Sequence, residues 1–161
     1  MKIPYIDFQA NFIKHAESAK KFLYGEFTMD DVDYKVFTED GITAYIIPKC
    51  MWWLNDDRIA ERFGNPNDHF DTLVKTNLDN AKFIQKTGTI LTAKGDVVVM
   101  ESFEHDLKLY VDPKKFKEFD KPDFTFKAYA ADKVFYVYWN GSLCALLCPI
   151  RPKFKSEEDP F

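Results

Sequence analysis

A tight hairpin near the C-terminal end constrains this chain more than any other stretch of its sequence. Asn140-Gly141 separates a run of β-branched and aromatic residues at 134–139 from an apolar run at 142–148. Asn and Gly tolerate the positive φ angles that two-residue hairpin turns require. Both faces of this ribbon carry apolar side chains, so we expect it to be covered on both faces or to meet a partner.

A strand, a short helix and another strand are expected immediately before this hairpin. Residues 107–111 alternate like a strand, and Asp112-Pro113 supplies an N-cap and a first-turn proline for a helix at 114–119. Apolar residues alternate again over 124–128. The predicted order of this part is therefore β-α-β-β-β.

This order resembles the last repeat of bacterial-type DNA sliding clamps, the DNA polymerase III beta-subunit family. Those proteins also close on an apolar strand followed by a hydrophobic-Pro-hydrophobic-Arg ending, which corresponds here to Cys148-Pro149-Ile150-Arg151. A cysteine stands where clamps typically have methionine. The similarity is best over residues 107–151, and it implies a clamp-like α+β scaffold whose helices face the DNA backbone.

The first 50 residues are expected to repeat this architecture without repeating its sequence. Residues 3–8 suit a short strand, and apolar residues at helical spacing over 12–23 predict a helix that Gly25 closes. Strands are expected at 34–37 and 42–47. The predicted fold class is α+β, with two β-α-β-β-β repeats forming a DNA-clamp-like domain and an inserted helix between them.

The segment between the two repeats is the least regular part of the chain. A helical turn is expected at 58–63 and a helix at 69–82, followed by strands at 87–95 and 96–101. The expected domain organisation is a single domain over 1–152, with repeat one at about 1–50, the inserted segment at about 51–85 and repeat two at about 86–152. Residues 153–161 are expected to be a mobile acidic tail.

Composition favours one globular domain and gives no global attraction to nucleic acid. The chain has 161 residues, of which 46% are hydrophobic, and a formal net charge of −4. No segment reaches the roughly 20 apolar residues of a membrane span, so we expect a cytoplasmic protein without membrane contact. Cys50, Cys144 and Cys148 are expected to be buried thiols without disulfides.

Familiar catalytic and cofactor motifs do not occur in the sequence. It contains no nucleotide-binding glycine loop, nucleophile elbow or zinc-ligand spacing, so we expect no enzyme activity, no cofactor and no metal. The densest acid and imidazole cluster is Glu101, Glu104, His105 and Asp106, which has the chemistry of a divalent-ion site or an acid/base pair. The other interpretation of this cluster is a solvated loop between strands.

Two sets of residues are candidates for binding. By the clamp resemblance, five lysines on the predicted helices would contact DNA phosphates without reading bases, the alternative being ordinary solvated helix faces. These candidates are Lys14, Lys21, Lys114, Lys115 and Lys117. Met51, Trp52 and Trp53 form a candidate interaction patch, with core burial as its alternative.

The leading functional expectation is a non-catalytic DNA-metabolism or mobile-element protein. With a sliding-clamp-like scaffold it would bind the backbone of double-stranded DNA, or replication proteins, as a monomer or dimer. The alternative is a small-ligand or protein-binding α+β module with no nucleic-acid role. A hydrolase built on the Glu101–Asp106 cluster is the third hypothesis.

Overall fold

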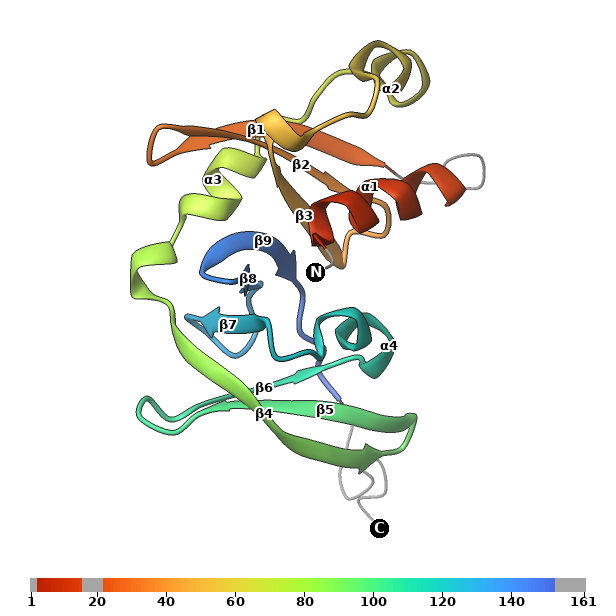
Figure 1. Ribbon diagram of the computed structural model, residues 1–161. Coiled ribbons are helices and arrows are strands. Elements are labelled where there is room, and N and C mark those ends of the chain that lie inside the picture. The colour runs from red at the N-terminus through yellow and green to blue at the C-terminus, as the bar shows by residue number, and fades with distance from the viewer. Residues whose placement is uncertain (1–2, 16–21, 153–161) are drawn as a thin grey trace. The chain divides into compact units, whose positions relative to one another are not determined.

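The fold class is α+β, and the chain divides into two compact units (Figure 1). A computed structural model describes residues 3–15 and 22–152. The first unit comprises Met1–Thr76 together with Leu143–Leu146, and the second comprises Asn77–Ser142 together with Leu147–Phe161. The boundary at residues 76 and 77 falls inside the segment that we expected as an insertion.

The first unit begins with a helix and continues as an antiparallel meander. The helix α1 is followed by strands β1, β2 and β3, which pair with one another in chain order. The part of strand β9 (Ser142–Leu147) that belongs to this unit lies beside β3. The bounds are α1 Pro4–His15, β1 Leu23–Met29, β2 Val32–Thr38, β3 Thr43–Pro48, η1 Lys49–Met51, α2 Asp56–Phe63 and α3 Phe70–Lys75.

Two predictions for the start of this unit are wrong. Residues 3–8 were expected as a strand, but the helix α1 already begins at Pro4. Proline suits the first turn of a helix, because the backbone N–H that it lacks would have no partner within the helix there. The expected helix over 12–23 fails at its end, since Leu23 and Gly25 lie in β1. Strand pairing with β2 outweighs the local helical spacing there. The strands expected at 34–37 and 42–47 are confirmed as β2 and β3.

An aromatic cluster forms the core of the first unit. Phe12 of α1 stacks on Phe22 with ring centroids 4.4 Å apart, and Phe37 of β2 lies 5.6 Å from Phe12. Phe63 of α2 lies 4.6 Å from Phe22. Aromatic rings bury more apolar area than other side chains, which lets a small unit build a sufficient core.

The predicted helical turn at 58–63 is confirmed by α2, whose N-cap Asn55 accepts a hydrogen bond from the Arg58 backbone N–H. The helix expected over 69–82 is shorter than predicted. It is α3 alone, because Asn77 adopts a left-handed conformation with φ of 62° and a separate 3-10 turn follows.

The second unit is built on one long strand with two different partners. The strand β4 pairs antiparallel with β7 over residues 82–84 and with β5 over residues 85–92. The strand order in this unit is β8-β7-β4-β5-β6. The bounds are η2 Leu78–Asn80, β4 Lys82–Thr92, β5 Gly95–Ser102, β6 Leu107–Val111, α4 Pro113–Phe116, η3 Lys117–Phe119, β7 Phe124–Ala128, β8 Phe135–Trp139 and β9 Ser142–Leu147.

Helix α4 and the turn η3 cover one face of this sheet. Phe116 of α4 lies 5.3 Å from Phe126 of β7, and Phe119 of η3 meets Phe124 edge to face at 5.4 Å. The predicted cap of this helix is confirmed, because the Asp112 carboxylate accepts a hydrogen bond from the Lys114 backbone N–H. The predicted strands at 107–111 and 124–128 are confirmed as β6 and β7.

The predicted turn between β8 and β9 is confirmed by its backbone angles. Asn140 has φ of 47° and Gly141 has φ of 85°, as a primed two-residue turn requires. The expectation for the cysteines is wrong at one position. Cys144 is buried in β9 and Cys148 is half-buried, but Cys50 is exposed in the short turn after β3.

Candidate functional site

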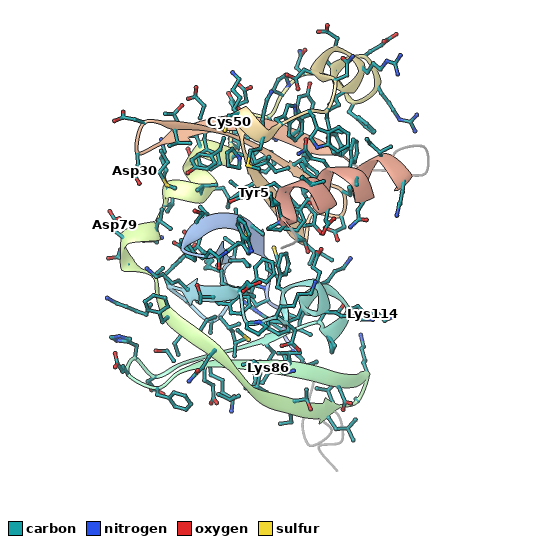
Figure 2. The ribbon with its side chains drawn as sticks, viewed as in Figure 1. Tyr5, Asp30, Cys50, Asp79, Lys86 and Lys114 are labelled. Carbon is teal, nitrogen blue, oxygen red and sulfur yellow. The ribbon has the colours of Figure 1, made fainter. Side chains whose placement is uncertain are left out.

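An open groove of about 700 Å³ lies on the second unit. Three segments line it: residues 81–86 of β4 and the chain before it, residues 101–105 at the end of β5, and residues 124–127 of β7. In Figure 2, Lys86 marks its position on the β4 ribbon.

The groove exists because β4 changes its partner along its length. Pairing with β5 ends at the Gln85–Glu101 pair, so residues 82–84 have a strand partner only on the β7 side. The turn from β5 to β6 passes the other side of these residues without pairing, and Asp106 closes that turn with φ of 48°. The space between the β4 start and this turn is the groove.

Large aromatic side chains project into solvent at this groove. Phe83 is 65% exposed and Phe103 is 74% exposed. Phe83 pairs across the strands with Lys127 of β7, whose Nζ lies 4.5 Å from the Phe83 ring centroid and 5.4 Å from that of Tyr138. One lysine therefore sits between two aromatic rings, held there by cation–π attraction.

The lysines of the groove differ in whether a carboxylate neutralises their charge. Lys86 forms an ion pair with Asp120 at 3.0 Å. Within the described ranges, neither Lys82 nor Lys127 has a carboxylate partner. These two cations remain available to an anionic ligand.

The acidic residues that line the groove lie at its β5 end. Glu101 is paired with Lys108 at 3.8 Å, and Glu104 lies 3.7 Å from His105 Nε2. Both Glu101 and Glu104 line the groove, as does His105, whereas Asp106 does not. In the part of the chain that the structure describes, no group of three His, Cys, Asp or Glu side chains has the geometry to hold a metal ion.

The candidate lysines of the predicted helices are distributed over both units. Lys14 is exposed on α1 of the first unit, while Lys114 and Lys117 are exposed and Lys115 is half-buried in the second. Lys114 projects away from α4 in Figure 2. Lys21 lies outside the described residues. The contact of these lysines with DNA phosphates stays a prediction.

A second cavity, of about 670 Å³, brings Lys114 together with two cations that sequence reasoning did not single out. Lys94 from the β4–β5 turn and Arg151 from the segment after β9 line it beside Lys114. Two carboxylates, Asp96 and Asp112, line it as well. Three lysines or arginines and two carboxylates line each of the two cavities, and in this one Arg151 is already paired with Asp132 at 3.1 Å.

The candidate patch Met51–Trp53 is tied to α1 through a buried glutamine. Gln9 donates from Nε2 to the Met51 carbonyl at 3.0 Å and accepts from the Trp53 N–H at 2.9 Å. Met51 and Trp52 are half-buried, and Trp53 is half-exposed. These three residues are therefore neither fully buried in the core nor part of a continuous exposed patch.

Beside this segment lies a nearly buried lysine with two carboxylate partners. Lys35 Nζ lies 2.6 Å from Glu26 Oε1 and 3.0 Å from Asp56 Oδ2, and 5.5 Å from the Trp52 ring centroid. Trp52 Nε1 also donates to Asp56 at 2.8 Å. Burial alone would lower the pKa of Lys35, but its hydrogen bonds to Glu26 and Asp56 outweigh it, and the pKa is raised.

Sequence reasoning missed Phe83, Lys82 and Lys127 as site residues. The stretch 81–82 was assigned to the end of a helix, so the start of β4 was not recognised. The available signal was the Lys-Phe-Ile-Gln-Lys stretch at 82–86, where a phenylalanine and lysines occur together in a strand-forming context.

Comparisons with protein-family models, curated proteins and solved structures gave no match to this chain. Among the described residues, no helix combines the length and the apolar character that crossing a membrane requires.

Proposed function

We propose that this protein is a non-catalytic nucleic-acid-binding protein of DNA metabolism, and that the groove of the second unit holds a nucleic-acid backbone. The observation that carries this proposal is that two lysines lining the groove, Lys82 and Lys127, have no carboxylate partner in the described structure. Lysines without a carboxylate partner can neutralise the phosphates of a nucleic-acid backbone, and such contacts need no catalytic group.

The distribution of charge along the chain supports this location. Residues 1–76 contain nine lysines and arginines against thirteen aspartates and glutamates, whereas residues 77–161 contain thirteen of each. The acidic excess therefore lies outside the second part of the chain. A local basic surface there is compatible with the overall charge of −4.

The order of elements supports a clamp-like scaffold as part of the same proposal. Along the chain, a helix followed by three strands occurs twice, as α1-β1-β2-β3 and as α4-β7-β8-β9 with η3 after the helix. In that scaffold, α4 and η3 present Lys114, Lys115 and Lys117 as further candidates to contact duplex DNA or replication proteins, and α1 separately presents Lys14.

The test is fluorescence anisotropy with labelled oligonucleotides, titrated with protein at several salt concentrations. We expect weak binding without sequence preference that falls steeply with salt, because counterions are released from the phosphates. The variant Lys82→Glu/Lys127→Glu is expected to lose most of this binding. Lys133→Glu is the matched control, since Lys133 is exposed in the same unit but does not line the groove.

A second variant separates the groove from the helix lysines. It reverses the charge of Lys14, Lys21, Lys114, Lys115 and Lys117. Binding that survives the groove variant but is lost in this one would move the site to the helix lysines and contradict the groove assignment. The absence of saturable binding to any oligonucleotide would contradict the proposed function.

The alternative, a small-ligand module, is favoured by the size of the groove. A volume of about 700 Å³ lies within the range of small-molecule sites. A thermal-shift screen of small aromatic anions discriminates the two functions. Stabilisation by such a compound, combined with no oligonucleotide binding, would establish the alternative.

A further inference from the structure

We infer that the groove takes single-stranded nucleic acid, with bases stacked on Phe83 and Phe103 and the backbone passing beside Lys127. This inference rests on the proposed function and specifies its ligand. Single-stranded nucleic acid accounts for the exposed aromatic side chains, which a site that binds only the phosphate backbone does not need.

Exposing two aromatic rings to water is unfavourable. A phenylalanine side chain has no polar group to contact water, so two exposed rings that line one groove favour a ligand that covers them. Phe83 and Phe103 are 65% and 74% exposed, whereas Phe126 on the opposite face of β7 is buried. Nucleic-acid bases are flat, apolar on their faces, and stack on such rings whatever their sequence.

A lysine lies close to two aromatic rings at the groove. Lys127 Nζ lies over both Phe83 and Tyr138, so its charge is held at the level of the aromatic surface instead of extending into solvent. A base on Phe83 would bring its own phosphate to the neighbourhood of this ammonium group. Aromatic platforms flanked by cations are the arrangement that binds single strands without reading them.

A duplex cannot place its bases on these two rings. Bases in a duplex are stacked on one another, so their faces do not reach a protein ring without unpairing. The phosphates of a duplex would contact the lysines, but Phe83 and Phe103 would stay exposed to water. The aromatic contribution is therefore specific to single strands.

Acidic residues limit the path of the strand. Glu104 is largely exposed, and with Glu101 it lies at the β5 end of the groove. Phosphates avoid carboxylates, so the backbone passes on the β7 side, beside Lys127, and the bases point toward Phe103.

The experiment compares three labelled ligands of equal phosphate number: a single-stranded oligonucleotide of about 12 nucleotides, its abasic counterpart, and the corresponding duplex. Anisotropy at low salt is expected to show that the base-bearing single strand binds at least about ten-fold more tightly than the abasic strand. A 2-aminopurine placed in the single strand is expected to lose fluorescence on binding, as stacked 2-aminopurine does.

Variants assign the effect to the two rings. Phe83→Ala and Phe103→Ala are each expected to reduce the preference for base-bearing strands while leaving the salt dependence unchanged, since no charge is removed. Leu91→Ala is the matched control, because Leu91 is an apolar residue of β4 that is 74% exposed and does not line the groove. Circular dichroism of each variant confirms that it is folded.

The outcomes separate this inference from the proposed function. Equal binding of the base-bearing and abasic strands would overturn the inference and leave backbone binding standing. The same holds if the alanine variants keep the full preference of the native protein. Failure of all three ligands to bind would overturn both.

Discussion

Lys35 illustrates how a single buried charge organises its surroundings in the first unit. It pairs across the strands with Glu26 of β1 and reaches Asp56 at the start of α2. Only 7% of its side chain is exposed, while both carboxylates are about half-exposed. The lysine thus depends on its partners for solvation, whereas water solvates the carboxylates if the lysine is removed.

Lys35→Met is expected to destabilise the protein by about 1–2 kcal/mol, less than a fully buried pair costs because both carboxylates reach water. Lys49→Met is the matched control, since Lys49 is half-exposed and lies 3.7 Å from the same Glu26. Its expected effect is within about 0.5 kcal/mol. Chemical denaturation measures both, and equal losses for the two variants would contradict the role assigned to burial.

At the scale of elements, the segment before α3 crosses β1 at a glycine. The Asn67 backbone N–H donates to the Tyr24 carbonyl at 2.7 Å, which holds the segment on the strand. A Cβ at Gly25 would overlap the Asn67 carbonyl oxygen and lie 2.9 Å from Phe70 Cδ2. The absence of a side chain at residue 25 is therefore what allows this contact.

Gly25→Ala is expected to cost about 2–3 kcal/mol, because the backbone of residues 67–70 must move away from β1. Gly88→Ala is the control: Gly88 also lies in a strand, and no atom lies within 4 Å of its Cβ position. That variant is expected to be neutral or to stabilise by up to about 1 kcal/mol. Melting curves of the two variants measure these changes in stability. An unchanged stability of Gly25→Ala would contradict the close contact between residue 25 and residues 67–70.

At the scale of the whole molecule, buried tyrosines make stability depend on alkaline pH. Burial, reinforced by Tyr129 and Tyr138, raises the pKa of Tyr136 from 10.0 to about 12. Burial also raises the pKa values of Tyr5 and Tyr138. A raised pKa means that the folded state holds the proton more tightly, so the associated stability is complete below pH 10 and is lost as the pH rises toward 12.

The free energy of unfolding is therefore expected to fall above pH 10, by about 1.4 kcal/mol per pH unit for each tyrosine that ionises only on unfolding. Tyr136→Phe is expected to make this fall shallower, because one such group is removed. Urea unfolding at several alkaline pH values, with tyrosinate absorbance as the probe, provides the measurement. Parallel pH profiles for the native protein and the variant would contradict the assignment.

The features that the sequence predicted correctly are those that neighbouring residues decide. The Asn140-Gly141 turn follows from the positive φ angles that these two residues tolerate, and the cap at Asp112 from a carboxylate next to free backbone N–H groups. The strands at 107–111 and 124–128 follow from their alternation. Each of these causes acts within a few residues, so no knowledge of the rest of the chain was needed.

The first helix and the groove could not be predicted in the same way, because distant parts of the chain decide them. Leu23 and Gly25 continue a helical spacing, but β2 offers them a strand partner, and pairing outweighs propensity. Lys82 and Phe83 became groove residues only because β4 leaves β5 at Gln85. The sequence by itself determined the turns, the cap and most strands. The tertiary structure decided which strands pair, and hence which aromatic rings are buried and which, like Phe83 and Phe103, remain exposed.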